Sequence, residues 1–279
     1  MADLNRAIAL NPKDSLALAC RGQIYRQQKR YRSAIADLNQ AIAFDPRSPW
    51  KLAERGETLR LLGQYQSALA DFNQALAWQA NDAWTLASRG LTQQLLGNHG
   101  AALADFKQAL ELQPDDVWTI GARAATYRAL RHYDEALADL QQAIRLHPDY
   151  AWAIGQCGEL QLLSHHYTEA LTWFNRALQL HAQSDWTLYQ RALAQRSLEQ
   201  VSLATADLDA AIHLATERHQ QQPNNARNLL NLALYYLVLG QAQQAQHWYR
   251  QALALHAGSE LIWMSSRDLE DLLVLLPET

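Results

Sequence analysis

The seven residues Ala36-Asp37-Leu38-Asn39-Gln40-Ala41-Ile42 form an alanine-rich helical segment that returns along the chain with small changes. The next copy, 34 residues later, is Ala70-Asp71-Phe72-Asn73-Gln74-Ala75-Leu76, and an earlier copy begins at Ala2. Further copies begin at Ala104, Ala138, Thr172 and Ala206. A fixed period of this length is typical of proteins built from stacked structural repeats, so it decides the fold class before any other signal.

Small and large residues recur at fixed positions of a repeat frame that starts at Ser15. Position 20 and position 27 are always alanine, while position 8 is glycine or alanine: Gly22, Gly56, Gly90, Ala124, Gly158, Ala192 and Ala233. Position 24 is always large: Leu38, Phe72, Phe106, Leu140, Phe174, Leu208 and Tyr249. Small residues let two helices approach and the large residue fills the remaining gap. Each repeat therefore predicts two packed helices, helix A over positions 1 to about 14 and helix B over about 18 to 31.

Breaker residues agree with this division of each repeat. Gly63, Gly97 and Gly240 fall in the turn between the helices, where a left-handed residue ends a helix at low cost. Pro46, Pro114, Pro148 and Pro223 follow helix B, which proline cannot continue.

The small residues at 8, 20 and 27, the large apolar residues at 4 and 24, proline at 32 and the period of 34 resemble the tetratricopeptide repeat. The resemblance covers almost the whole chain. Position 4 departs from the family's tryptophan, being Leu18, Leu52 or Ile120, and position 11 keeps tyrosine only at Tyr25, Tyr127 and Tyr236. The resemblance implies an all-α fold, a right-handed superhelical solenoid of antiparallel helix pairs.

The frame predicts seven full repeats between two partial elements. The repeats are expected at 15–48, 49–82, 83–116, 117–150, 151–184, 185–225 and 226–259, with a capping helix within 260–279. Residues 1–14 match only helix B of a truncated repeat, so we interpret the sequence as a fragment of a longer protein with Met1 as an added start. The repeat 185–225 holds seven extra residues, which are predicted to lengthen its helix B to about Gln221.

Composition and motifs narrow the function classes. A net charge of -4 and a pI near 6.2 disfavour binding to nucleic acid or to an anionic membrane. Cys20 and Cys157 lack the spacing of a disulfide or metal site, which favours the cytoplasm. His165 and His166 are expected to be solvated turn residues, and Cys157 an inert packed thiol. No phosphate loop, nucleophile elbow or zinc-protease motif occurs, so the chain is predicted to be no enzyme and to need no cofactor or metal.

Two series of residues stand out from the repeat background. The first joins position 7 to position 23: Arg21, Arg55, Arg89, Arg123 and Arg191 occur with Asp37, Asp71, Asp105, Asp139 and Asp207. Where position 7 is Cys157 or Leu232, position 23 is Trp173 or Trp248, so both positions change together. We therefore predict that each arginine pairs with the aspartate of its own repeat.

The second series, called here the tryptophan series, stands at position 2: Trp50, Trp84, Trp118, Trp152 and Trp186. In tetratricopeptide arrays, positions 2, 5, 9, 12 and 13 of helix A face a concave groove that holds peptides. The resemblance therefore adds these candidate binding residues: Glu57, Arg60, Arg128, Glu159, Tyr189 and Arg196. The alternative is that each indole packs as a plug against position 30 of the preceding helix, at Phe44, Trp78, Leu112, Leu146 or Leu180.

These observations predict a non-enzymatic scaffold that binds a partner protein or peptide in a tryptophan-lined groove. One alternative is a sensor or regulatory region from a multidomain signalling protein, whose groove receives another domain of the same chain. The other is a helical-repeat reader of single-stranded RNA, which stacks bases on aromatic side chains. The sequence leaves the oligomeric state open.

Overall fold

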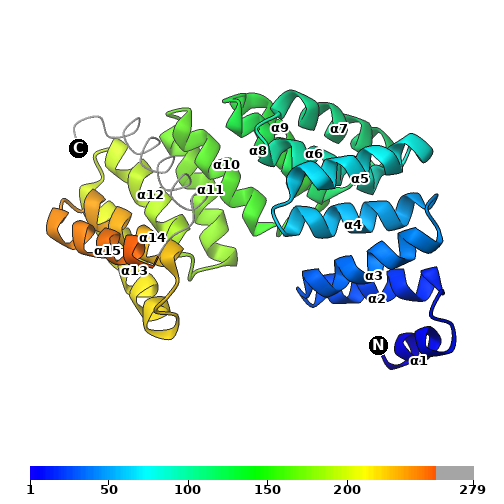
Figure 1. The fold of residues 1–279 in the computed structure, drawn as a ribbon. Helices are drawn as coiled ribbons and strands as arrows, with labels where there is room; N and C mark the ends of the chain where they lie inside the picture. The colour runs from blue at the N-terminus through cyan, green and yellow to red at the C-terminus, as the bar shows by residue number, and fades with distance from the viewer. Residues whose placement is uncertain (256–279) are drawn as a thin grey trace. The chain divides into compact units, whose positions relative to one another are not determined.

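The computed structural model describes residues 1–255, and all regular structure in that range is α-helical (Figure 1). The first eight helices are α1 (Ala2–Leu10), α2 (Ser15–Gln27), α3 (Tyr31–Phe44), α4 (Pro49–Leu61), α5 (Tyr65–Trp78), α6 (Ala83–Leu95), α7 (His99–Leu112) and α8 (Val117–Ala129). The others are α9 (Tyr133–Leu146), α10 (Ala151–Leu163), α11 (Tyr167–Leu180), α12 (Asp185–Ser197), α13 (Val201–Gln221), α14 (Ala226–Val238) and α15 (Ala242–Ala254). The all-α prediction is confirmed; the predicted capping helix within 260–279 lies outside the described residues.

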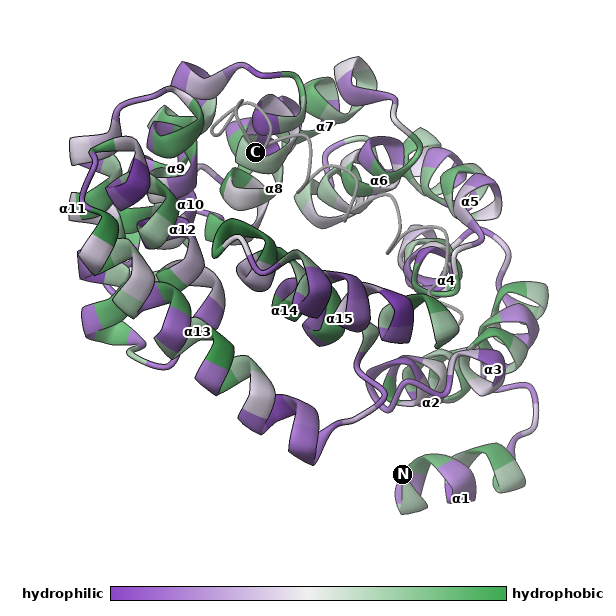
Figure 2. Ribbon diagram, turned by 90° about the vertical axis from the view of Figure 1, so that its left-hand side faces the viewer, coloured by the Kyte–Doolittle hydropathy of each residue, from purple (hydrophilic) through white to green (hydrophobic). Residues whose placement is uncertain are grey.

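The chain divides into two compact units, called here unit 1 (Met1–Asp139) and unit 2 (Leu140–Thr279). In unit 1, α2 packs on α3, α4 on α5 and α6 on α7, while α4 also contacts α2 and α6. Figure 2 shows α4 and α6 on one side of this unit and α5 and α7 on the other. In unit 2, α10 packs on α11, α12 on α13 and α14 on α15, and α10 also contacts α12. Each unit is therefore a double layer of helix pairs with its core between the layers.

Close contact within a helix pair depends on glycine opposite phenylalanine. A Cβ atom added to Gly158 would lie 2.5 Å from the ring of Phe174, and one added to Gly56 would lie 2.9 Å from the ring of Phe72. Both rings are fully buried. In the next helix pair of unit 2, the larger Ala192 occurs with the smaller Leu208.

The predicted arginine–aspartate pairs are confirmed in all five repeats that carry them. Each guanidinium binds its carboxylate through two nitrogen atoms, as in Arg89 Nη2–Asp105 Oδ1 at 2.6 Å and Nε–Oδ2 at 2.9 Å. The other pairs have shortest distances of 2.6 to 2.7 Å: Arg21–Asp37, Arg55–Asp71, Arg123–Asp139 and Arg191–Asp207. Hydrogen bonds to the aspartates raise the pKa of Arg21, Arg55 and Arg123 above the usual arginine value, against the lowering effect of burial. The five pairs bridge helices A and B of their repeats.

A third residue joins four of these pairs, and the sequence reasoning missed it. Arg89 Nη1 donates to Asn73 Oδ1 at 2.9 Å, and Asn73 belongs to helix B of the preceding pair. The same bond is made between Arg21 and Asn5, Arg55 and Asn39, and Arg191 and Asn175. The fifth arginine, Arg123, follows Lys107 at that position. The arginine thus fixes the contact between neighbouring pairs as well as its own pair.

The predicted lengthening of helix B is also confirmed, because α13 spans 21 residues where α3, α5, α7, α9 and α11 span 14. Ala215, the first residue beyond the usual helix end, is completely buried. Its carbonyl oxygen accepts a hydrogen bond of 2.8 Å from Asn228 Nδ2 of α14. The extension is therefore a packed part of unit 2.

Candidate functional site

Three indoles of the tryptophan series are exposed at the starts of their helices. Trp84 on α6 and Trp118 on α8, both in unit 1, are 40% and 48% exposed, and Trp152 on α10 in unit 2 is 43% exposed. α6 and α8 contact each other, so Trp84 and Trp118 occupy equivalent first-turn positions on neighbouring helices. Indoles that are nearly half exposed are available to another molecule.

The two end members of the series are half-buried and pack within the protein. Trp50 packs against the core cluster formed by Leu18, Ala19, Leu38 and Ala41. Trp186 lies against Tyr189, with ring centroids 5.2 Å apart, and the guanidinium of Arg227 stands 5.4 Å from the Trp186 ring centroid. These contacts differ from those of the plug interpretation, which expected Phe44 beneath Trp50 and Leu180 beneath Trp186.

The other candidate groove residues are mostly engaged within the chain. Glu57 and Arg60 pair with each other at 2.6 Å, and Arg196 donates to the carbonyl oxygen of Val238. Glu159 is buried and accepts a hydrogen bond of 2.8 Å from Gln156. Tyr189 is 3% exposed, so its ring belongs to the core. Arg128 is half-buried on α8.

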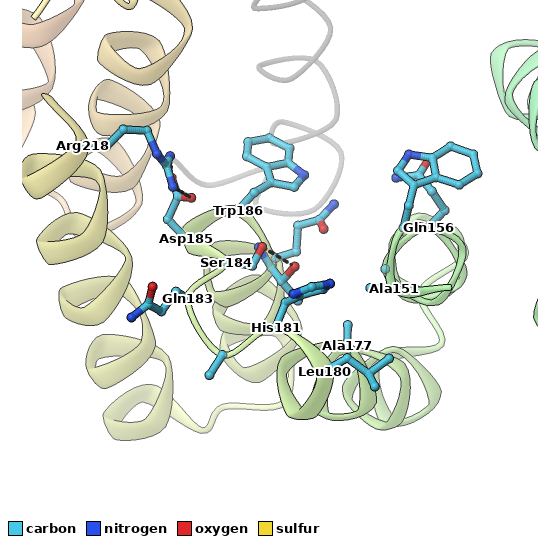
Figure 3. Close-up of a pocket in the computed structure, with 15 residues that line it drawn as sticks. Ala151, Gln156, Ala177, Leu180, His181, Gln183, Ser184, Asp185, Trp186 and Arg218 are labelled. Atoms are coloured by element: carbon cyan, nitrogen blue, oxygen red, sulfur yellow. Dashed lines mark hydrogen bonds and ion pairs between the residues drawn. The ribbon is translucent and has the colours of Figure 1, made fainter. Parts of the chain in front are cut away.

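A pocket of about 660 Å³ lies in unit 2 between the starts of α10 and α12. Figure 3 shows Trp186 and Gln156 rising on opposite sides of it, with Leu180 and His181 below. Trp152 and Gly155 of α10 and Gln190 of α12 also line the pocket. The volume lies within the range of about 300–1,000 Å³ that is common for ligand pockets.

One side of this pocket carries an ion pair with a buried carboxylate, which the sequence reasoning missed. Arg218, from the α13 extension, donates two hydrogen bonds of 2.9 and 3.0 Å to the carboxylate of Asp185. The hydroxyl of Tyr235 donates a third at 3.0 Å, and burial raises the pKa of Tyr235 well above its usual value, so it stays a neutral donor. Only the seven extra residues hinted at this pair, because they place Arg218 about one turn beyond the usual helix end.

A second pocket, of about 410 Å³ and mostly apolar, lies between α14 and α15. Its lining includes Leu230, Leu234 and Tyr249. Among residues 1–255, no three His, Cys, Asp or Glu side chains come together in a way that could hold a metal ion. Within the same range, no helix combines the length and apolar character that crossing a bilayer requires.

We expect iodoacetamide to alkylate Cys20 of the folded protein at least tenfold faster than it alkylates Cys157. Cys157 is completely buried, and desolvation raises the pKa of its thiol to about 12, whereas Cys20 is partly exposed. Because the thiolate is the reactive species, Cys157 presents almost none of it at pH 8. Peptide mapping by mass spectrometry after timed iodoacetamide treatment measures both rates, and equal rates would contradict the packed-thiol assignment.

Comparison with known proteins gives repeated family matches. One model described as tetratricopeptide repeat matches residues 127–196, and another matches 52–82, 85–116 and 226–256. A model described as TPR repeat matches residues 22–62. No curated protein matches the chain.

Solved structures share the fold at low sequence identity. A tetratricopeptide repeat protein from Parabacteroides merdae is 18% identical with a TM-score of 0.70, over 94% of this chain and 98% of that chain. PilF of Pseudomonas aeruginosa is 17% identical with a TM-score of 0.62, over 75% and 92%. YrrB, described as a TPR protein with an unusual peptide-binding site, is 18% identical with a TM-score of 0.56, over 66% and 95%. Since the family models together match more than half of the sequence, and the helix pairs recur with the same period, the chain belongs to the tetratricopeptide repeat family.

Proposed function

We propose that the chain is a non-enzymatic scaffold that binds a partner protein or peptide through the exposed indoles of its A helices. The observation that carries the proposal is the pair Trp84 and Trp118, held half-exposed at equivalent positions of adjacent helices. A tryptophan buries up to about 250 Å² in a contact, and tryptophan is among the residues enriched where binding energy concentrates. The peptide-binding site described for YrrB supports a peptide as one form of the partner.

The helices that carry these indoles are anchored by buried side chains. Residues after Trp84 on α6, including Leu86 and Ala87, are almost fully buried, and so are Thr119 and Ile120 after Trp118 on α8. The two indoles are therefore carried on helices anchored by their own cores. Preorganised contacts reduce the entropy lost on association, which raises the affinity available from a given area.

The test is a selection of random twelve-residue peptides on the full chain, followed by affinity measurements with variants. We expect the joint Trp84→Ala and Trp118→Ala variant to lose at least tenfold in affinity for selected peptides, with little change in melting temperature. The matched control is Trp78→Ala, because Trp78 is 44% exposed but lies at the end of α5, outside the series. Unchanged binding by the double variant, or equal loss in the control, would reject the proposal.

The same variants separate the remaining alternatives. If the partner is another domain of a longer protein, that domain supplied in trans must compete with the selected peptides. If the chain reads single-stranded RNA, oligonucleotides must bind with a strong salt dependence and must lose affinity when Trp84 and Trp118 are replaced. The net charge of -4 favours the protein partner, and the cytoplasm remains the proposed compartment.

A further inference from the structure

We propose that the unit 2 pocket between Trp152 and Trp186 binds one uncharged aromatic side chain of the partner and hydrogen-bonds the adjoining peptide group through Gln190. This inference rests on the proposed function and names the chemistry of one subsite. It concerns unit 2 alone, so it can fail while the indoles of unit 1 still bind a partner.

The walls of the pocket are two helices that present the same pair of residue types. α10 carries Trp152 and, one turn later, Gln156, while α12 carries Trp186 and, one turn later, Gln190. Residues four apart lie on the same helix face, so each wall offers an indole above an amide. In unit 1 the residues in the place of these amides are Glu54, Ser88 and Ala122, so the arrangement is specific to unit 2.

Gln190 points to a ligand because its side chain lines the pocket and has no hydrogen-bond partner in the described chain. The residue is 4% exposed and lines the pocket, yet its side chain forms no hydrogen bond with any part of the described chain. Gln156, by contrast, donates to Glu159. An amide group can donate to and accept from a peptide bond, so a bound backbone would satisfy it.

The space above the amides is open at Gly155. A Cβ atom built on this residue has no atom within 4 Å, in contrast to the crowded Gly158 on the same helix. Gly155 therefore leaves room beside Trp152 for a side chain that comes from outside. A flat ring suits this place because aromatic rings pack favourably on one another in offset or tilted arrangements.

The charges around the pocket select a neutral occupant. Asp185 is buried and its carboxylate is occupied by Arg218 and Tyr235, so it offers no free negative charge to a bound lysine or arginine. Arg227 already stands 5.4 Å from the Trp186 ring centroid, where it would repel a second cation. An anion would have to lie beside the carboxylate of Asp185. An uncharged aromatic side chain is repelled neither by Arg227 nor by the carboxylate of Asp185.

The experiment labels the nine tryptophans of the full chain with 5-fluorotryptophan and follows their ¹⁹F resonances, assigned by single Trp→Phe variants. The probes are acetylated, amidated pentapeptides with two glycines on each side of Phe, Leu or Lys. We expect the Phe probe to shift the Trp152 and Trp186 resonances and to bind at least tenfold more tightly than the Lys probe. Gly155→Leu should weaken the Phe probe at least tenfold, and Gln190→Leu about fivefold.

The matched control is Gly100→Leu in α7, where an added Cβ also has no atom within 4 Å, and it should leave binding unchanged. Shifts confined to Trp84 and Trp118 would overturn the pocket while supporting the proposed function. The pocket is also overturned if the Lys probe binds as well as the Phe probe, or if the Phe probe retains its affinity in Gly155→Leu or in Gln190→Leu. The absence of any shift of the Trp152 and Trp186 resonances would also overturn the pocket proposal.

Discussion

Asp105→Ala is expected to lower the free energy of unfolding by roughly 3 kcal/mol, at the lower end of the range for breaking a buried ion pair from one side. The carboxylate is buried while the side chain of Arg89 is 24% exposed, so water compensates part of the loss. The substitution removes both acceptors of Arg89 on α7 and leaves its charge facing a core position. Urea denaturation monitored by circular dichroism measures the change.

The chain itself supplies the matched control for this prediction. Leu232 and Trp248 stand where other repeats carry the ion pair; Leu232 belongs to the core of unit 2, and Trp248 is partly buried against that core. The joint replacement Arg89→Leu with Asp105→Trp should therefore cost far less than Asp105→Ala alone, because no charge is left unpaired. If Arg89→Ala and Asp105→Ala instead add without coupling in a double-mutant cycle, the bridge contributes nothing to stability.

The second large effect is expected from two glycines of the same helix. Gly158→Ala should leave the protein about 1–3 kcal/mol less stable than Gly155→Ala, since only the first alanine meets the ring of Phe174. Both substitutions gain the same helix propensity, about 1 kcal/mol, so their difference isolates the clash. The comparison is made from thermal and urea unfolding of the two variants.

A rescue variant makes the Gly158 prediction specific. Phe174→Leu in the Gly158→Ala background reproduces the combination Ala192 with Leu208 found in the next helix pair, and it should recover part of the lost stability. The same Phe174→Leu change in the wild-type background should cost stability, because it opens space beside Gly158. Equal stability of Gly158→Ala and Gly155→Ala would show that the helices move apart without cost.

The sequence predicts the fold well because most helix pairs are held by the same kinds of contact between residues at fixed positions. The spacing of Gly158 and Phe174, or of Arg89 and Asp105, is a fixed distance along the chain that recurs with the period of the repeats. Asn73 escaped notice because its partner lies in the following helix pair, and because asparagine in an exposed helix position is unremarkable by itself. Contacts within one repeat are therefore easier to predict than contacts between repeats.

The candidate site was predicted only in outline for a physical reason. Position 2 is equivalent in all repeats, yet Trp118 is exposed and Trp186 is half-buried, because Trp186 has Tyr189 and Arg227 as neighbours. The pocket was missed altogether, since Gln190 and Arg218 come from different helices and neither occupies a position that the repeat pattern marks. Exposure of a side chain depends on such neighbours, which differ between repeats even where the backbone does not.

The length of α13 has a consequence for how helices of this kind can grow. Seven residues turn a helix to within about 20° of two complete rotations, so Ala215 continues the buried stripe of Ala204, Leu208 and Ala211. An insertion of five residues would rotate everything beyond it by roughly 140° and carry Ala215 to the outer side. A heptad is thus a natural step for spacer engineering: adding one to helix B displaces the following loop by about 10 Å while preserving the angular position of every residue that packs.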